Sequence, residues 1–222
     1  ICEIVSKLGI RKIKITGGEP LVRKDIVNLI RDIKNIDKIE QVTLTTNGIL
    51  LHEMLDDLYD AGIDAINISL DTLNKDNFKK ITRRDGLEKV LMSIDKAYDL
   101  GIRVKINCLA IRDFNLRELV EIASFAKDRE IDVRFIELMP IGFGKKYTQI
   151  DNDEILSILE SRFGTFEIVT EKRGNGPAVY YANENFKGCI GFISAISHEF
   201  CETCNRVRLT SNGFLKLCLH YN

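Results

Sequence analysis

The stretch Lys12-Ile13-Lys14-Ile15-Thr16-Gly17-Gly18-Glu19-Pro20 decides the fold of this 222-residue chain. Its first half alternates charged or polar residues with isoleucine, which is the two-residue period of a β-strand with two different faces. Gly17 and Gly18 let the backbone approach a ligand closely, and Glu19-Pro20 is typical of the approach to a helix. We therefore expect a strand that ends at a ligand.

The same strand-then-helix unit recurs through residues 10–163. Strands are predicted at Lys12–Thr16, Gln41–Thr46, Ala65–Leu70, Arg103–Ala110 and Val133–Met139. Helices are predicted at Asp25–Asn35, His52–Ala61, Gly86–Leu100, Leu116–Arg129 and Asp151–Phe163. Such alternation indicates a parallel sheet built from right-handed crossovers.

Each of the first four strands has one apolar and one polar face. The polar positions are Lys12, Lys14, Thr16, Thr43, Thr45, Asn47, Asn67, Ser69, Asp71, Lys105 and Asn107. A parallel strand covered by helices on both faces is nearly all apolar. The polar face must therefore line a cavity, which favours an incomplete (β/α) barrel over a doubly wound open sheet.

Polar turns follow the predicted strands, at the edge where parallel barrels build their active sites. These turns are 16–20, Thr45-Thr46-Asn47-Gly48, Ser69-Leu70-Asp71-Thr72 and Glu137-Leu138-Met139-Pro140. Any one of them could be an ordinary connecting turn. Because they share one rim beside a polar interior, we interpret them together as a binding edge.

Residues 164–222 have a different character. Strands are predicted at Phe166–Thr170, Ala178–Ala182, Lys187–Ser194 and Val207–Leu219, with turns at 174–177 and 211–213. We expect residues 1–163 to form the partial barrel and residues 164–222 to form a C-terminal antiparallel β extension.

Three cysteines in this extension form a candidate metal site. Cys201 and Cys204 are two residues apart, and Cys218 follows a hairpin-like stretch. Three thiolates suit an iron–sulfur cluster with one open iron. The alternatives are a structural zinc site, a redox dithiol or buried thiols; His198, His220 or Cys189 would be the fourth zinc ligand.

Composition narrows the class of protein. The net charge is −1 and no apolar run reaches the length of a membrane helix, which argues against a partner in nucleic acid or a membrane. Six cysteines in an average composition indicate a reduced, cytoplasmic setting. The chain starts at Ile1, inside what reads as a helix, and we expect it to be an internal fragment of a longer protein.

Several of these segments resemble a known family. The turn at 16–20 is similar to the glycine-rich turn of radical S-adenosylmethionine (SAM) enzymes. The runs 188–194 and 200–209, the latter Phe-Cys-Glu-Thr-Cys-Asn-Arg-Val-Arg-Leu, resemble one family of that superfamily, the GTP 3′,8-cyclases of molybdenum cofactor biosynthesis (molybdenum cofactor biosynthesis protein A). The resemblance spans essentially the whole chain and implies an incomplete barrel with a C-terminal β extension.

The resemblance also implies a reaction. Two [4Fe–4S] clusters are expected in the family, one that cleaves SAM to a 5′-deoxyadenosyl radical and one, C-terminal, that anchors GTP. The radical would remove the ribose 3′ hydrogen, and C3′ would attack C8 of guanine. The product would be (8S)-3′,8-cyclo-7,8-dihydroguanosine 5′-triphosphate, and its formation would be the first step of molybdopterin biosynthesis. An electron donor is implied, and a homodimer is one candidate assembly.

Residue by residue, the family match assigns roles in this chain. It implies that the C-terminal cluster is bound by Cys201, Cys204 and Cys218. It implies that GTP is bound by Lys14, Thr45, Lys105, Arg206, Val207 and Arg208, with Arg206 and Arg208 also controlling the radical. It implies that SAM contacts Gly18, Ser69 and Met139.

The chain also departs from the family. The Cys-x3-Cys-x2-Cys motif of the first cluster is absent, so the fragment itself is expected to be inactive and its parent to be the enzyme. Lys14 stands where some members have Arg, which keeps the charge and loses the bidentate fork. Two alternatives stay open: another radical SAM enzyme with an auxiliary cluster, such as a peptide-modifying one, and a non-catalytic zinc-binding module.

Overall fold

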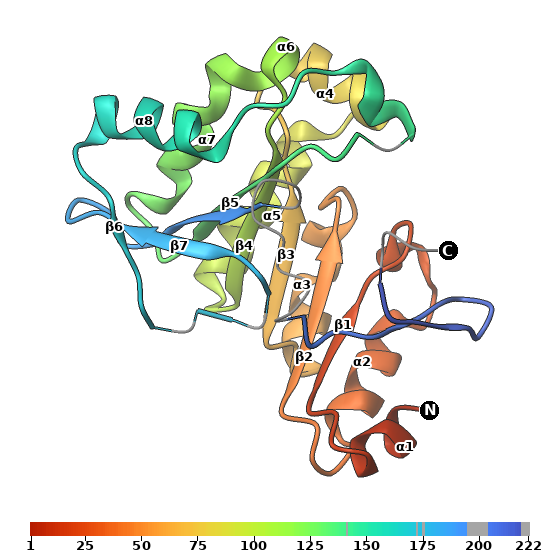
Figure 1. Ribbon diagram of the computed structural model, residues 1–222. Helices are drawn as coiled ribbons and strands as arrows, with labels where there is room; N and C mark the ends of the chain where they lie inside the picture. The colour runs from red at the N-terminus through yellow and green to blue at the C-terminus, as the bar shows by residue number, and fades with distance from the viewer. Residues whose placement is uncertain (141, 172, 175, 195–203, 219–222) are drawn as a thin grey trace.

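The computed structural model describes residues 1–222 except 141, 172, 175, 195–203 and 219–222 (Figure 1). Its α-helices are α1 Cys2–Lys7, α2 Ile26–Lys34, α3 Leu51–Asp60, α4 Lys75–Thr82, α5 Leu87–Asp99, α6 Arg112–Asn115, α7 Leu119–Ala123 and α8 Asn152–Phe163. Short 3-10 turns lie at η1 Pro20–Val22, η2 Leu116–Glu118, η3 Ser124–Ala126 and η4 Gly142–Lys146.

An eight-stranded sheet organises the molecule. Its strands are β1 Lys12–Ile15, β2 Gln41–Thr46, β3 Ala65–Ser69, β4 Arg103–Leu109, β5 Asp132–Ile136, β6 Glu167–Ile168, β7 Val179–Ala182 and β8 Ile190–Ile193. Their order is β1-β2-β3-β4-β5-β8-β7-β6, parallel from β1 through β8 and antiparallel beyond it. The predicted incomplete barrel is confirmed as a mostly parallel α/β sheet.

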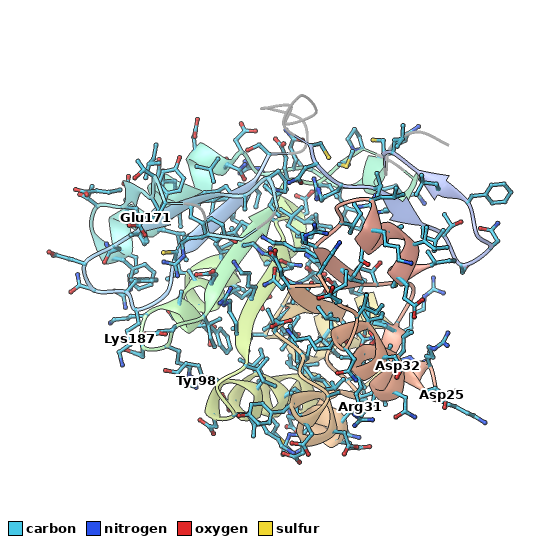
Figure 2. All side chains as sticks on the ribbon, turned by 90° about the horizontal axis from the view of Figure 1, so that it is seen from below. Asp25, Arg31, Asp32, Tyr98, Glu171 and Lys187 are labelled. Atoms are coloured by element: carbon cyan, nitrogen blue, oxygen red, sulfur yellow. The ribbon has the colours of Figure 1, made fainter. Side chains whose placement is uncertain are left out.

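The two faces of the sheet differ as the sequence predicts. The apolar face packs against α2, α3 and α5 and forms the core, whose strand residues include Val42, Leu44, Ile66, Ile68, Val104, Ile106, Val133 and Phe135. Figure 2 shows Arg31 and Asp32 of α2 and Tyr98 of α5 on the outer side of this helical layer. The opposite face carries the polar side chains, so it is the surface that can receive a polar ligand.

The predicted helix Leu116–Arg129 is wrong in its form and its end. The segment is divided into η2, α7 and η3, and it stops at Ala126. There the carbonyls of Ala126 and Lys127 accept hydrogen bonds from the backbone N–H groups of Gly188 (2.8 Å) and Lys187 (2.9 Å). The chain that leads into β8 therefore takes the carbonyls that a longer helix would use.

One feature of the C-terminal part was not anticipated. β8 pairs parallel with β5, so this strand continues the barrel sheet before β7 and β6 turn antiparallel. The turn predicted at 211–213 within Val207–Leu219 is confirmed: the segment forms a short hairpin of β9 Arg208–Leu209 and β10 Leu215–Lys216, with a turn at Gly213. Figure 1 shows this hairpin beside β1 and α2. It forms a two-stranded sheet separate from the eight-stranded one.

Candidate active site

A group of cations meets on the polar face of the sheet. Lys14 is on β1, and its pKa is lowered to about 8, first by partial burial and then by the positive charges of Arg134, Arg206 and Lys105. These residues come from β1, β4, β5 and the segment just before β9. Such crowding of like charges is unfavourable unless an anion offsets it. We refer to Lys14, Lys105, Arg134 and Arg206 as the cation group.

Arg134 is the most enclosed arginine of this group. Its exposed fraction is 7%, and Nη2 donates to Oδ1 of Asn67 on β3. Asn67 in turn donates to the carbonyl of Leu44 (3.0 Å) and to Oγ1 of Thr45 (3.3 Å). Within the described residues, Nε of Arg134 has no hydrogen-bond partner. A buried donor of this kind is expected to meet a ligand.

Lys105 of β4 is buried, and it lies beside Asp132 of β5. Its Nζ lies 2.8 Å from Oδ2 of Asp132 and donates to Oη of Tyr180 (2.9 Å) and to the carbonyl of Arg173 (3.3 Å). Asp132, at the start of β5, is the carboxylate that offsets part of the positive charge here.

The carboxyl ends of β1 and β2 are joined by one carboxylate. Glu19 accepts from the hydroxyl of Thr46 (2.7 Å) and from the N–H groups of Leu21 (3.1 Å) and Asn47 (2.8 Å). Glu19 therefore fixes the glycine-rich turn against the turn after β2. Beside it, a Cβ on Gly18 would meet no atom within 4 Å, so this backbone is open to a ligand.

The residues assigned to SAM lie at this same edge. Gly18 follows β1, Ser69 is the last residue of β3, and Met139 comes three residues after β5. Ser69 pairs in register with Asn107, and Asn107 pairs with Arg134. Oδ1 of the half-buried Asn107 is an enclosed acceptor with no partner in the described part of the chain. The rim thus offers both an acceptor and an open backbone.

Asp71, two residues past the end of β3, is a half-buried residue. It accepts from the N–H of Leu109 at 2.8 Å, and burial raises its pKa. Asn115 donates to the carbonyls of Asp71 (2.7 Å) and Leu109 (2.8 Å). This network ties the ends of β3 and β4 together.

The structure describes two of the three predicted cluster ligands. Cys204 is exposed, and its pKa is lowered chiefly by a hydrogen bond from the backbone N–H of Arg206, with smaller contributions from the Arg206 side chain and from Arg208. Cys218 is half-buried, and Cys201 lies outside the described residues. A lowered pKa favours the thiolate, the form that binds iron or zinc, so the donor set fits a metal centre.

The zinc alternatives gain no ligand in the described part of the chain. No three His, Cys, Asp or Glu side chains gather there in a way that could hold a metal. His198 and His220 fall outside the described residues. Cys189 is buried, with its pKa raised by that burial, and Cys108 is fully buried, so both are packed thiols.

Reasoning from the sequence missed several residues of this site. Arg134 and Asp132 lie on the polar face of β5, and their alternation with Val133 and Phe135 was a signal that could have found them. Asn67 was placed on the polar face but received no role. Tyr180 had no signal, because it reaches Lys105 through the pairing of β7 with β8.

The chain matches known families along almost its whole length. Residues 1–126 match the Radical SAM superfamily, and residues 131–222 match the family described as Molybdenum Cofactor Synthesis C. Among solved structures, a domain of pyruvate-formate lyase-activating enzyme from Bacteroides vulgatus has a TM-score of 0.55 at 13% identity, covering 67% of this chain and 92% of that one. SuiB from Streptococcus suis, bound to S-adenosylmethionine, has a TM-score of 0.54 at 18% identity, covering 71% of this chain and 36% of that one.

Curated relatives are much closer in sequence. The "GTP 3′,8-cyclase" of Clostridium perfringens strain 13 is 50% identical over 97% of this chain and 67% of its own length. "Molybdenum cofactor biosynthesis protein 1" of Drosophila melanogaster is 44% identical over 100% of this chain and 40% of its own length. The chain therefore belongs to the GTP 3′,8-cyclase family of the radical SAM superfamily.

Proposed function

We propose that this chain is the catalytic barrel and C-terminal part of an enzyme that converts GTP to (8S)-3′,8-cyclo-7,8-dihydroguanosine 5′-triphosphate, in the first step of molybdenum cofactor biosynthesis. The relatives at 41–50% identity support this activity. The structural observation that carries it is the cation group, because the charges of Lys105, Arg134 and Arg206 all act on the partly buried Lys14. As the chain spans about 67% of the length of its Clostridium perfringens relatives, the activity is proposed for the whole protein.

The cation group is suited to a triphosphate. Arginine presents a planar fork of N–H donors that matches phosphate oxygens, and lysine adds a compact charge. Lys14, Lys105 and Arg134 come from the sheet, while Arg206 comes from the C-terminal segment. The pKa of Lys14 is lowered first by burial and then by the neighbouring cations, and a bound triphosphate would offset the repulsion from those cations.

The C-terminal cysteines would hold the substrate-side cluster. Cys204 and Cys218, together with Cys201, supply the thiolates, and Arg206, two residues after Cys204, belongs to the cation group. When bound, a [4Fe–4S] cluster with three thiolate ligands offers an iron with an open position for the substrate. Arg206, Val207 and Arg208 would hold GTP beside it, and the two arginines would keep the reacting nucleotide in place.

The carboxyl edge of the sheet would hold SAM. The open backbone at Gly18 and the positions of Ser69 and Met139 at the carboxyl edge support this assignment. When bound, SAM supplies the 5′-deoxyadenosyl radical that removes the ribose 3′ hydrogen before C3′ attacks C8 of guanine. Glu19 keeps the first two turns of this rim in a fixed relation to each other.

The remaining expectations stay predictions. They are the SAM-cleaving cluster, an electron donor, a homodimer, a cytoplasmic location and a division near residue 163. Of the helices in the described part of the chain, none has the length and apolarity to cross a bilayer. The competing proposals are a peptide-modifying radical SAM enzyme and a non-catalytic zinc-binding module. The relatives named as GTP 3′,8-cyclases support neither of these two proposals.

The test is turnover by the full-length parent, reconstituted anaerobically with iron and sulfide and reduced with dithionite. With GTP and SAM we expect one 5′-deoxyadenosine for each molecule of an isomer of GTP that contains the new C3′–C8 bond, measured by mass spectrometry. Cleavage of SAM that gives no nucleotide product, or an equal yield from ATP, would overturn the proposal.

A further inference from the structure

Lys105 has an unusually complete set of partners for a lysine proposed to bind substrate. Its exposed fraction is 8%, and its Nζ forms an ion pair with Asp132 at 2.8 Å. It also donates to Oη of Tyr180 at 2.9 Å and lies 4.8 Å from the centre of the Tyr180 ring. The ammonium is therefore held on two sides, by a carboxylate and by a tyrosine.

Asp132 is itself fixed by the surrounding backbone and side chains. Its Oδ1 accepts from Nη2 of Arg173 at 3.2 Å and from the N–H of Cys189 at 3.3 Å, which leaves Oδ2 directed at Lys105. The partners come from the segment before β7 and from the entry to β8. A carboxylate held from several elements can set the position of a flexible lysine.

A merely structural pair is a poor account of this arrangement. Removing two charges from water is costly, and apolar residues of similar size would stabilise a fold as well or better. Moreover, the Lys105 charge contributes to the lowered pKa of Lys14, so the ammonium lies near the other members of the cation group. The pair is placed where substrate phosphates would be bound.

We propose that Asp132 and Tyr180 are positioning residues that hold the Lys105 ammonium ready for the triphosphate of the substrate. This inference rests on the proposed function. A lysine side chain has a long flexible stem, and fixing it before binding removes part of the entropy that binding would otherwise cost.

The geometry leaves a place for an incoming phosphate oxygen. Among the three polar contacts of Lys105 Nζ, the carbonyl of Arg173 is the most distant, at 3.3 Å. A phosphate oxygen can replace this neutral acceptor while the ion pair with Asp132 and the bond to Tyr180 remain. The Arg173 segment is then the part of the site that adjusts on binding.

The test compares isosteric variants of the reconstituted parent protein. Tyr180→Phe keeps the ring over Lys105 and removes only the hydroxyl acceptor, while Asp132→Asn removes the charge at constant shape. Tyr181→Phe is the matched control, because this neighbour packs edge-on against Phe192 at 5.5 Å between ring centres, on the other side of β7. Binding of GTP and of guanosine is measured for each protein by calorimetry.

Positioning predicts a selective effect on the phosphates. Tyr180→Phe should weaken GTP binding about tenfold, as expected for one hydrogen bond to a charged group, and Asp132→Asn should weaken it at least as much. Guanosine binding should change less than twofold in either variant, and Tyr181→Phe should match wild type. KM for GTP should rise while kcat changes little.

A double-mutant cycle identifies Lys105 as the intermediary. In a Lys105→Met background, Tyr180→Phe should have no further effect on GTP binding. Equal loss of GTP and guanosine binding would show a structural role and overturn the inference, as would unchanged GTP binding in both variants. If wild type itself fails to bind GTP, the proposed function fails instead, so the two failures are distinct.

Discussion

At the scale of single residues, the site is a balance between charge repulsion and ligand binding. The charges of Lys105, Arg134 and Arg206 all act on Lys14, and Lys105 has a carboxylate partner in Asp132. Bringing cations together costs free energy in the unliganded protein. A highly charged anion would offset this repulsion on binding, so we expect the site to bind such an anion more tightly than a neutral ligand.

Lys14 makes this balance measurable through pH. Its pKa of about 8 means that the side chain is charged below that pH and loses its proton as the pH rises through it. GTP affinity should therefore fall by about tenfold between pH 7 and pH 9, the effect of one charge-assisted contact. Titrating GTP binding by calorimetry across this range checks the prediction.

Replacement of Lys14 by arginine provides the control. Arginine stays charged across the whole range, so Lys14→Arg should flatten the pH dependence while retaining affinity at pH 7. Lys80→Met, an exposed change on α4, should leave the wild-type profile intact. A wild-type profile that is flat between pH 7 and pH 9 would show that Lys14 does not contact the phosphates.

At the scale of elements, the turns that follow the strands are tied to one another by side chains. Glu19 joins the turn after β1 to the turn after β2, and Asn115 joins the ends of β3 and β4. These bonds run between elements far apart in the sequence. They turn a row of independent loops into one edge of defined shape.

Changing Glu19 to Gln should disrupt that edge. One carboxylate oxygen accepts from Thr46 and Leu21, and the other accepts from the N–H of Asn47. An amide group would place a donor against one of these donors, and we expect a loss of about 1–3 kcal/mol in the free energy of unfolding. Urea denaturation measures it, with Glu3→Gln on the exposed part of α1 as control. Equal stability of the two variants would mean that Glu19 does not link the turns.

β8 provides a second element-scale prediction. A Cβ on Gly191 would lie 2.9 Å from the Tyr180 ring and 3.0 Å from the side chain of Arg134. Gly191→Ala should therefore displace two side chains of the site and weaken GTP binding about tenfold, an amount equal to about 1.4 kcal/mol. Gly176→Ala, where a Cβ meets nothing within 4 Å, should bind normally. Normal GTP binding by Gly191→Ala would show that the site tolerates this displacement.

The sequence predicts local features better than distant ones. The alternation in Lys12–Ile15 indicated both the strand and its polar face, because a period of two is set by the backbone itself. Helix α4 escaped prediction, since Phe78 is the only buried residue in its eight. The parallel pairing of β8 with β5 and the contact of Tyr180 with Lys105 depend on tertiary structure, which no local pattern encodes.

The candidate site divides in the same way. Lys14, Thr45 and Lys105 could be placed on one face from strand parity alone, and Cys204 and Cys218 from their spacing. Asp132 could have been found by the same parity argument. The lowered pKa values could not be predicted: that of Lys14 arises first from its burial and then from cations on other elements, and that of Cys204 arises chiefly from a hydrogen bond that depends on the local backbone conformation at Arg206.

At the scale of the whole molecule, two family matches share one sheet. Residues 1–126 supply β1 to β4. Residues 131–222 supply β5 to β8 and the hairpin of β9 and β10, which Cys204 and Cys218 flank in sequence. The hairpin lies beside β1, at the opposite edge of the sheet from β6 (Figure 1), and Arg206 from this segment acts on Lys14. The C-terminal part thus adds a cation to the group that the barrel strands begin.

The central claim is that the C-terminal cysteines and the cation group form one GTP site. The most direct test is electron paramagnetic resonance of the C-terminal cluster in the anaerobically reconstituted, reduced parent, titrated with GTP and then with ATP. We predict about four irons bound per C-terminal site and a cluster signal that GTP shifts and ATP does not. Stoichiometric zinc without sulfide, or a cluster signal that GTP leaves unchanged, would contradict the account.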